Sequence, residues 1–555
     1  MYKKKFFFIF LLCIPILSLL AEKSSSKNRL LDKAAETFTV HISNGIPNLH
    51  PHTSYSADEA QILTALFEGL VVYDPYTLQP LPALAESWTV SSNGLTWIFH
   101  IRKHICFQNG DPITAETFKR SWLNLLSPEF NLPYASLLDI VAGAKDYRTG
   151  VVKDENTVGI SVEGSDKKTL VVTLIQPAKH FINILCHHAF SAVHPTEFKK
   201  TEKFFKLKDI PSAKEALNPI ASGPFQIEKF SDNLLTLRTN PYYWDRQRVS
   251  IKNLNIILEN SPEKSSDGFN AGSIHWLGGT VPLKLIADTT TVRVTPMFAT
   301  EYFYFKVNAA PTDAELLRKA LLLAIPYKEL RADYLLPAQT LIFPLAGYPS
   351  VKGIDEYNFR KAQDTLSALK PNIANMPPIK ILIPENAYYK KLAAILKNAW
   401  TKLLLPVEIW SIPFASYYDA LKTGDYNVGI ISWIGDFADP LAFLEMFKAH
   451  SSLNDSGWNN QKFEKRIEEA SDENDFQKRY RLLADAEQIL LDNAVILPLS
   501  HSPAINVIDL RSIGGWYPNA INIHPFKFIK FIIPAPLPGV VSAKDIETNY
   551  LTSSK

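Results

Sequence analysis

The sequence predicts a mixed α/β protein that is divided into two to four domains or lobes. Its 555 residues exceed what one hydrophobic core usually organises. Hydrophobic residues make up 46% of the chain and charged residues 21%, which excludes a disordered or fibrous protein. Strand-like and helix-like segments alternate along the chain without a repeat period, as expected for this class.

The first 21 residues have the pattern of a secretory signal peptide. Three lysines, Lys3, Lys4 and Lys5, precede an uncharged run over residues 6–21. This run is short for a membrane span, which needs about 20 apolar residues, so an N-terminal anchor is the less favoured alternative. Lipidation of Cys13 is also less favoured, because bulky Leu12 precedes it. Residues 22–37 are polar and predict a flexible tether.

Charge and cysteine content limit the partners. The net charge is +2, and the three leader lysines account for this excess. A nearly neutral body argues against nucleic acid as the main partner. Cys106 and Cys186 form either one disulfide in an oxidising compartment or two buried thiols, and the sequence leaves both possibilities open.

The first third of the chain contains clear local signals. Residues 38–42 alternate like a strand, and Ser56 to Glu59 form a capping box before an apolar helical stripe ending at Leu70. Asn93-Gly94 separates two alternating segments, which predicts a hairpin. Residues 114–126 place Phe118, Trp122 and Leu125 on one helix face.

Further elements follow the same logic in the rest of the chain. The predicted strands cover residues 169–174, 236–238, 379–383, 428–433 and 495–499. The predicted helices cover residues 316–324, 362–369 and 388–403, and a charged region over 462–491 predicts two more. The tail after Phe531 is rich in proline and is expected to pack loosely.

The motif search favours a protein without catalysis or cofactor. No G-x-G-x-x-G, P-loop, G-x-S-x-G, H-E-x-x-H or C-x-x-C motif occurs. The nearest approach to a metal cluster is Cys186-His187-His188 with His194. Adjacent histidines on a strand would point to opposite faces, so packing or surface roles are favoured over a metal site. His50 and His52 are expected in a loop before the capped helix.

One segment has the pattern of a ligand site. The apolar strand from Val428 runs directly into Trp433, then into a turn that carries Asp436 and Asp439. The ends of strands gather ligands in α/β folds, and a carboxylate beside an indole suits a cationic amine. The pattern fits equally well with two helix-capping aspartates and a tryptophan that fills the core.

Taken together, these motifs resemble the oligopeptide/dipeptide-binding family of extracytoplasmic solute-binding proteins of ABC importers. The resemblance runs from about residue 38 to about residue 530. It rests on the number, order and spacing of short sequence segments. These are Leu66-Phe-Glu-Gly-Leu70, Ala85-Glu-Ser-Trp88, Trp97-Ile-Phe-His-Ile-Arg102, Asn109-Gly-Asp-Pro-Ile-Thr-Ala-Glu-Thr-Phe118, Ser222-Gly-Pro-Phe225, Asn240-Pro-Tyr-Tyr-Trp-Asp245 and the turn over 433–440.

The resemblance implies a bilobal periplasmic-binding-protein fold, with two hinged lobes of mixed sheets and an additional domain on the first lobe. Lobe I would comprise residues 38–71, 196–299 and 503–555, the last including the C-terminal tail. The additional domain would comprise residues 72–195, and lobe II residues 300–502. Such proteins close around their ligand by a hinge motion.

The resemblance also assigns residues to an interlobe cleft. Asp436 matches the acid that pairs with the α-ammonium of a peptide in relatives. The ring-bearing positions of the cleft are matched by Trp433, Phe414 and Tyr134. A cleft-facing acid near the first lobe is matched by Glu59.

The positions that hold the peptide carboxylate differ from those of the best-known oligopeptide binders. The basic residues of those proteins are replaced here by Tyr389, Leu421 and Ile430, with Lys422 as an adjacent substitute. The amine end is therefore better supported than the carboxylate end, and a cell-wall peptide or modified peptide is a variant of the hypothesis.

The resulting hypothesis is a monomeric, periplasmic, peptide-binding component of an ABC importer that delivers short peptides to an inner-membrane permease. It uses no metal or cofactor, and it contacts the membrane only through the permease or through an N-terminal anchor. One alternative is a binder of another solute with the same fold, such as a metal chelate, haem, a sugar or glutathione. The other is an envelope hydrolase or an adhesin.

Overall fold

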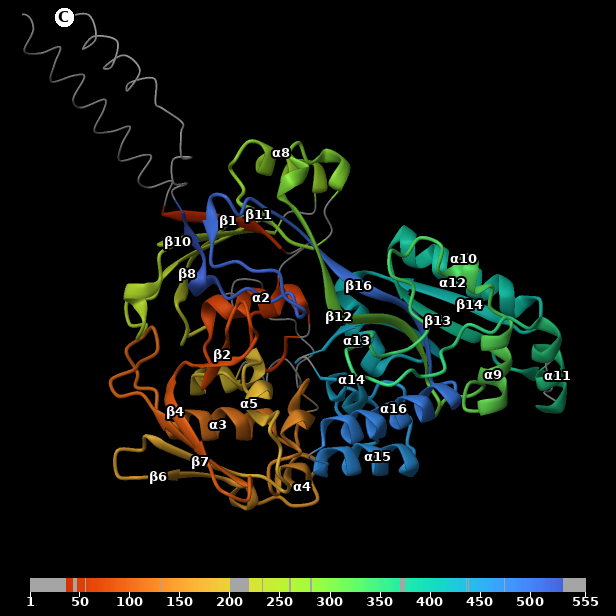
Figure 1. Cartoon of the computed structure of the whole chain (residues 1–555), viewed down its shortest axis with the longest axis horizontal. Coiled ribbons are helices and arrows are strands. Elements are labelled where there is room, and N and C mark those ends of the chain that lie inside the picture. Colours follow the sequence, from red (N-terminus) through yellow and green to blue (C-terminus); the bar gives the residue numbers. More distant parts are fainter. Residues whose placement is uncertain are drawn as a thin grey trace, which may run out of the picture.

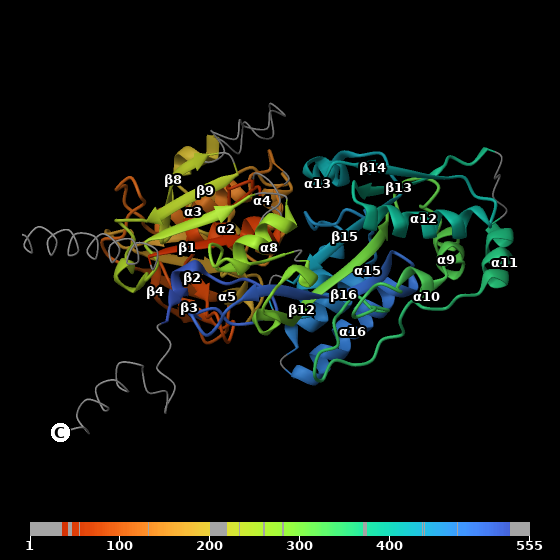
Figure 2. The same ribbon diagram turned by 90° about the horizontal axis from the view of Figure 1, so that it is seen from above.

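The computed structural model describes residues 36–42, 47–54, 56–130, 132–199, 219–231, 233–258, 261–279, 282–369, 375–435, 437, 439–473 and 475–532. Its central feature is a ten-stranded sheet with the order β14-β13-β15-β12-β16-β11-β1-β10-β9-β8. The two longest strands, β12 (Val292–Phe305) and β16 (Ile496–Ile508), run antiparallel through the middle of this sheet. They connect lobe I on one side of the molecule with lobe II on the other (Figures 1 and 2).

Lobe I contains the strands at one end of the sheet. Phe38 and Val40 are buried in β1 (Thr37–His41), as the alternating pattern predicts, and β1 pairs in parallel with β10 and β11. The remaining strands are β8 (Phe225–Ser231), β9 (Leu234–Thr239), β10 (Asn253–Ile257) and β11 (Trp276–Leu277). The helices of lobe I within the described ranges are α2 (Ala57–Leu66) and α8 (Pro262–Asn270).

The predicted capping box begins helix α2. The Ser56 hydroxyl accepts a hydrogen bond from Glu59 N at 3.2 Å, and the Glu59 carboxylate accepts one from Ser56 N at 3.1 Å. Such a cap contributes about 1 kcal/mol to helix stability. It fixes where α2 begins in lobe I.

Lobe II has parallel pairing at the other end of the sheet. Strand β13 (Ile379–Pro384) pairs in parallel with both β14 (Val407–Ile412) and β15 (Val428–Ile434), while β15 pairs antiparallel with β12. Its helices are α9 (Glu315–Leu323), α10 (Tyr327–Leu330), α11 (Phe359–Leu369), α12 (Ala387–Thr401), α13 (Phe414–Thr423), α14 (Leu441–Leu444), α15 (Gln461–Asp472) and α16 (Phe476–Asp492). The charged region over 462–491 thus forms two helices, which confirms that prediction.

The additional domain is built on a four-stranded sheet with the order β4-β5-β7-β6. The predicted hairpin is confirmed: β4 (Ala85–Val90) and β5 (Thr96–Ile101) pair antiparallel, and Gly94 in their turn has a φ of 72°. The other elements are β6 (Ile160–Glu163), β7 (Thr169–Thr173), α3 (Ala115–Leu125), α4 (Ala144–Arg148) and α5 (Phe181–Ile184).

Short elements complete the described chain. The strands β2 (Val71–Tyr73) and β3 (Pro80–Pro82) pair with each other, as do β17 (Ile513–Gly514) and β18 (Lys530–Phe531). The 3₁₀ turns are η1 (Ala135–Leu138), η2 (Glu155–Thr157), η3 (His188–Phe190), η4 (Arg246–Arg248), η5 (Leu283–Leu285), η6 (Thr289–Thr291), η8 (Glu445–Phe447) and η9 (Phe526–Phe528).

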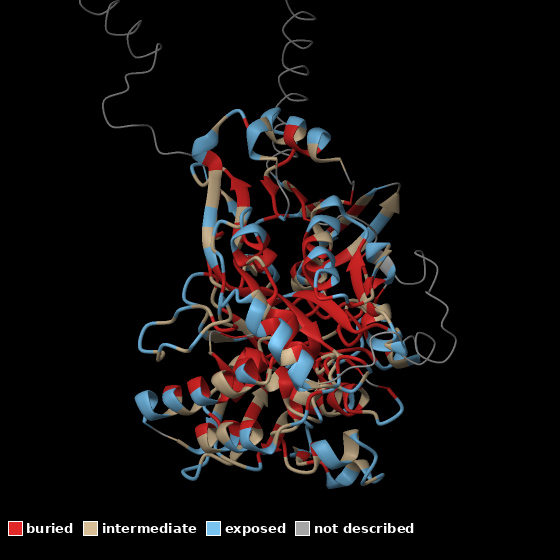
Figure 3. Cartoon of the chain, turned by 90° about the vertical axis from the view of Figure 1, so that its right-hand side faces the viewer, coloured by how far each residue is buried: buried red, intermediate tan, exposed pale blue. Residues whose placement is uncertain are grey.

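Buried apolar side chains form two main clusters. Figure 3 shows the buried residues in red, concentrated in the interior of the molecule. One cluster fills lobe I around Trp276 and Trp516. The other extends without interruption from the additional domain, around Trp122, to lobe II, around Trp400. The additional domain and lobe II are therefore in direct apolar contact in this arrangement.

Several predictions about the ends of the chain fall outside the described residues. The leader, Cys13, the tether up to residue 35 and the tail after residue 532 belong to this group. Thr37, which the tether was expected to include, is the first residue of β1. Cys106 and Cys186 are free thiols in this structure. Within the described ranges, no helix is both long enough and apolar enough to cross a membrane.

Candidate ligand site at the lobe boundary

Tyr134 and Trp433 meet where the additional domain contacts lobe II. Tyr134 precedes η1 in a left-handed conformation with a φ of 62°, and Trp433 is near the end of β15. Their ring centroids lie 6.2 Å apart, and both side chains are buried. The Trp433 indole Nε1 donates to the carbonyl of Ala442 at 3.1 Å, which fixes the ring orientation. Two residues predicted for the cleft are therefore neighbours.

His187 and His188 extend this aromatic group into the additional domain. The His187 ring lies 4.3 Å from the Tyr134 ring and 4.0 Å from the His188 ring. The expectation that these histidines diverge on a strand is wrong: His187 caps the 3₁₀ turn η3, and a turn allows adjacent rings to approach each other. Burial lowers the pKa of His187 to about 3, and the pKa of His188 is also lowered.

The histidines have ordinary hydrogen-bond partners. Ser54 Oγ lies 2.7 Å from His188 Nε2, and His52 Nδ1 lies 2.9 Å from Asn124 Nδ2. In the part of the chain that the structure describes, no group of three or more His, Cys, Asp or Glu side chains could hold a metal ion. The arrangement thus provides neutral ring surfaces and polar atoms at the boundary.

Asp436, the central acid of the hypothesis, lies outside the described residues, but both flanks of its turn are described. Gly435 N donates to Phe298 O at 2.8 Å, and the Phe437 ring stacks on His180 of the additional domain at 5.7 Å. Asp439 accepts from Leu441 N at 3.0 Å and forms a two-pronged ion pair with Arg479 at 2.6 and 2.9 Å. For Asp439, the helix-capping interpretation therefore describes its contacts.

Polar contacts also cross the boundary between the additional domain and lobe II. Ser136 Oγ lies 3.0 Å from Ser452 Oγ. Arg148 Nη2 donates to the carbonyl of His450 at 2.7 Å. The same guanidinium forms a two-pronged ion pair with Asp139, and the side chain of Arg148 is only 8% exposed. These contacts hold α4 and η1 against the segment that precedes α15 (Figure 1).

The start of α2 in lobe I faces α13 of lobe II. Glu59 accepts hydrogen bonds from Asn48 N at 2.7 Å and from Ser56 N, so both of its oxygens organise the helix start. Burial, together with Glu59, raises the pKa of the adjacent Asp58 to about 7. On lobe II, burial and then the charges of Glu59 and Asp58 raise the pKa of Tyr418 to about 12. The influence of Asp58 and Glu59 on the pKa of Tyr418 indicates that the start of α2 lies near α13.

On lobe II, the carboxylate of Glu301 lies among phenols. Glu301 Oε2 in β12 accepts from Tyr334 at 2.6 Å and from Tyr388 at 2.7 Å. Burial raises the pKa of Glu301, and the nearby phenols of Tyr334, Tyr388 and Tyr389 act in the opposite direction. Tyr389, predicted for the carboxylate end of the cleft, therefore lies near an acid.

The other predicted positions of this region differ in exposure. Lys422 Nζ donates to Asp455 Oδ1 at 2.7 Å and to Ser452 O at 3.0 Å, so its charge is already paired. Leu421 and Ile430 are buried in the core of lobe II. Phe414, the first residue of α13, is 56% exposed and lies 5.6 Å from the Tyr418 ring.

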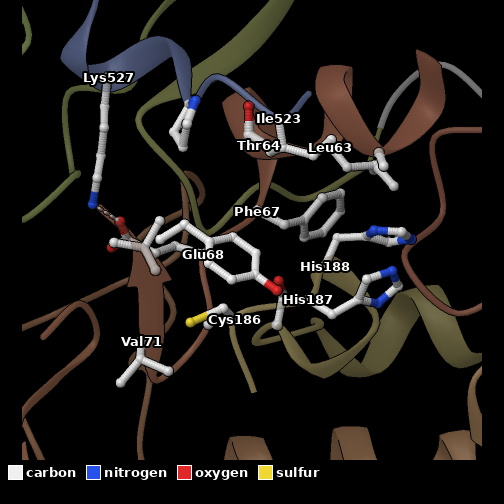
Figure 4. Close-up of a pocket in the computed structure, with 16 residues that line it drawn as sticks. Leu63, Thr64, Phe67, Glu68, Val71, Cys186, His187, His188, Ile523 and Lys527 are labelled. Atoms are coloured by element: carbon white, nitrogen blue, oxygen red, sulfur yellow. Dashed lines mark hydrogen bonds and ion pairs between the residues drawn. The ribbon is translucent and has the colours of Figure 1, made fainter. Parts of the chain in front are cut away.

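A small cavity adjoins the histidines on the lobe I side (Figure 4). Its lining includes Phe67, Cys186 and His188, and the buried ion pair of Glu68 with Lys527 closes its other end. Its volume of about 60 Å³ holds only a few water molecules. A peptide does not fit in this cavity, so the lobe boundary is the better candidate for a peptide site.

Sequence reasoning missed several residues of this boundary. Glu301 offered a signal, since it is an acid within the apolar run Thr300-Glu-Tyr-Phe-Tyr-Phe305. Asp58 and Tyr418 offered none, because their proximity depends on how the two lobes are placed.

Comparison with known proteins identifies the family. Residues 79–455 match the bacterial extracellular solute-binding proteins, family 5, in the middle region. The chain belongs to this family. As a member it is a solute-binding protein and not an enzyme.

Relatives of this family 5 protein match along most of their length. The oligopeptide-binding protein OppA of Bacillus subtilis is 26% identical over 502 residues, which covers 86% of this chain and 89% of the relative. The probable deoxycholate-binding periplasmic protein YgiS of Escherichia coli is 26% identical over 492 residues, which covers 84% of this chain and 88% of that protein.

Solved structures of similar fold differ in how well their lobes superpose on this one. Haemophilus influenzae OppA in complex with RPPGFSPFR has a TM-score of 0.78 at 22% identity, covering 90% of this chain and 99% of that chain. The unliganded open form of MppA has a TM-score of 0.58 at 24% identity, and the match covers 89% of this chain and 97% of that chain. The family 5 protein therefore matches the whole chain of the peptide complex better than that of the open form.

Proposed function

We propose that this protein captures short peptides between its lobes and delivers them to the permease of an ABC importer. Several relatives are named as oligopeptide- or dipeptide-binding proteins. The observation that carries the proposal is the contact of Tyr134 with Trp433 next to the Asp436 turn, at the boundary of the additional domain and lobe II. These rings come from elements that hinge motion would separate.

The chemistry of this boundary suits a peptide. Extended backbone is held by strand-like hydrogen bonds that do not depend on side-chain identity. The α-ammonium needs a counter-charge, because closure removes it from water. We assign this role to Asp436, and we assign the flanking apolar surface to Trp433 and Tyr134.

The proposal includes export and partner recognition. The basic, apolar leader would direct the chain to the periplasm, with an N-terminal anchor as the alternative. A permease would distinguish loaded from empty protein because ligand stabilises the closed arrangement. The protein would act as a monomer.

Native mass spectrometry of protein purified without denaturation tests the ligand class. We expect a ladder of co-purified masses that match short peptides. A single non-peptide mass, such as a bile acid or haem, would overturn the peptide proposal and leave the solute-binding function intact. Detection of cleaved products after incubation with a peptide library would instead contradict a non-catalytic role.

The assignment of Asp436 makes a sharper prediction. Asp436→Asn should weaken the binding of peptides with a free N-terminus by about 2–5 kcal/mol, because the ammonium loses its counter-charge. N-acetylated forms of the same peptides lack that ammonium and serve as the control, with little change expected. Isothermal titration calorimetry measures both. Equal affinity of variant and wild type for free peptides would contradict the role of Asp436.

A further inference from the structure

Tyr134 has a backbone conformation that is unfavourable for a tyrosine. Ala135 N donates to the carbonyl of Leu132 at 3.4 Å, so residues 132–135 form a β-turn with Tyr134 at its third position. The φ of 62° and ψ of −4° at Tyr134 are those of a type II turn, in which this position favours glycine or asparagine. Such strained residues persist where their surroundings hold them, and they are concentrated at functional sites. The contacts that hold the Tyr134 ring therefore bear on function.

Two histidine rings of the additional domain lie against Tyr134. We define the histidine pair as His187 and His188, which lie side by side at one end of the small cavity (Figure 4). Their ring centroids are 4.3 and 5.8 Å from that of Tyr134, whereas the Trp433 ring of lobe II is 6.2 Å away. Of these three rings, that of His187 is the nearest to Tyr134.

Hydrogen bonds fix the histidine pair independently of Tyr134. His187 Nδ1 accepts from Ala189 N at 3.3 Å, at the start of η3. His188 Nε2 lies 2.7 Å from the hydroxyl of Ser54, which belongs to lobe I. The two imidazole rings are 4.0 Å apart, so each also limits the movement of the other. The pair thus provides a fixed ring surface for Tyr134.

Hinge motion distinguishes the histidine contacts of Tyr134 from its contact with Trp433. Opening would move Trp433 away with lobe II, whereas the histidine pair is in the same domain as Tyr134 and would stay in contact with it. In an open arrangement, the Tyr134 ring would therefore still be held by the pair. A binding group that is held before the ligand arrives loses less conformational freedom on binding.

We propose that His187 is a positioning residue for peptide capture: its ring holds Tyr134 in the left-handed conformation that places the Tyr134 ring beside Trp433. This inference rests on the proposed peptide-binding function, in which Tyr134 supplies apolar surface to the peptide. His187 acts through Tyr134 and does not itself touch the ligand. His188, next to the Ser54 hydroxyl of lobe I, supports the His187 ring from the other side of the pair.

Two substitutions separate the ring of His187 from its hydrogen bond. His187→Asn keeps an acceptor for Ala189 N but removes the ring that contacts Tyr134. His187→Phe keeps a ring but has no acceptor. His104→Ala, at an exposed position of the same domain, is the control for losing a histidine. A library of tripeptides to pentapeptides with free N-termini is screened on the wild type, and the tightest binder is titrated into each variant by calorimetry at pH 7.5.

We expect His187→Asn to bind this peptide about tenfold or more weakly than the wild type, because the Tyr134 ring is no longer held. His187→Phe should bind within about threefold of the wild type, and His104→Ala should bind with unchanged affinity. A merely structural role of the hydrogen bond would give the opposite order, since the phenylalanine variant loses the contact with Ala189 N.

A double-mutant cycle tests whether His187 acts through Tyr134. Tyr134→Ala alone should weaken binding by about tenfold or more. Adding His187→Asn should weaken binding by a further factor of about three or less, because the group that His187 positions is already gone. Independent contributions would instead multiply, and the double variant would then bind about a hundredfold more weakly than the wild type.

The outcomes distinguish this inference from the proposed function. If no member of the library binds the wild type, the peptide-binding function fails and the inference fails with it. If the wild type binds peptide but His187→Asn or Tyr134→Ala binds equally well, or if the two losses multiply, only the positioning role is overturned. Equal weakening in His187→Phe and His187→Asn likewise overturns it, because the ring would then not matter. Should His187→Asn not fold, His187→Ala replaces it and is judged in the same way.

Discussion

Trp433 illustrates how a single residue serves both the core and the boundary. The sequence left two interpretations of this tryptophan open, core filling and ligand contact. Its ring is buried and its indole N–H is satisfied by Ala442, yet the ring also lies beside Tyr134 of another domain. The two interpretations are compatible in a protein whose domains meet around the residue.

The hydrogen bond of Trp433 gives a measurable stability effect. Trp433→Phe keeps an aromatic ring but leaves the Ala442 carbonyl without this donor, which should lower the free energy of unfolding by about 1–3 kcal/mol. Urea denaturation measures the loss. Trp410→Phe is the control, because Trp410 is 38% exposed and should cost about 0.5 kcal/mol or less. Equal losses in the two variants would refute the structural role of the indole N–H.

His187 predicts a pH dependence of stability. Its pKa is lowered by burial to about 3, whereas a histidine in an unfolded chain titrates near 6.5. The unfolded state therefore binds more protons between these values. The stabilising effect of a neutral His187 is fully present above pH 6.5 and is lost as the pH falls towards 3.

Removal of His187 should weaken this dependence. His187→Asn should reduce the loss of unfolding free energy between pH 6.5 and pH 5 by up to about 1.4 kcal/mol per pH unit. Chemical denaturation at a series of pH values measures the slope. His104→Asn, at an exposed position, is the control for losing a histidine. A slope identical to that of the wild type in His187→Asn would rule out this contribution.

At the scale of elements, local patterns predicted most helices and short strands. The capping box before α2, the Asn93-Gly94 hairpin and the two helices of 462–491 all have signals within a few residues. Strand β12 was missed and β16 was found only in its first residues. The two strands pair over about 200 residues of intervening chain, and local periodicity carries no information on such pairing.

The contact of α4 with the segment before α15 joins the additional domain to lobe II. Arg148→Ala removes the charge-assisted hydrogen bond to His450 O, whose loss costs about 1.5–3 kcal/mol. If the closed arrangement holds the peptide, we expect its dissociation rate to rise by about tenfold. Stopped-flow dissociation of a labelled peptide measures this rate.

Lys145→Ala provides the matched control for Arg148→Ala, because Lys145 lies on the same helix and is exposed. It should leave the dissociation rate unchanged. Dissociation from Arg148→Ala at the wild-type rate would show that the α4 contact does not contribute to retention of the ligand.

At the scale of the whole molecule, the sequence predicted the α/β class and, through its motifs, the two-lobe family fold. It could not predict which side chains face each other across the lobes. Tyr134 and Trp433 lie about 300 residues apart in the chain, yet their rings are neighbours in the fold.

The central claim is that a peptide closes the two lobes around itself. Small-angle X-ray scattering of ligand-free protein, with and without a saturating peptide, tests it most directly. A smaller radius of gyration is expected with peptide, together with a scattering curve that matches the arrangement of lobes in the structure. An unchanged curve, in a sample that calorimetry shows to be saturated, would contradict capture of peptide by lobe closure.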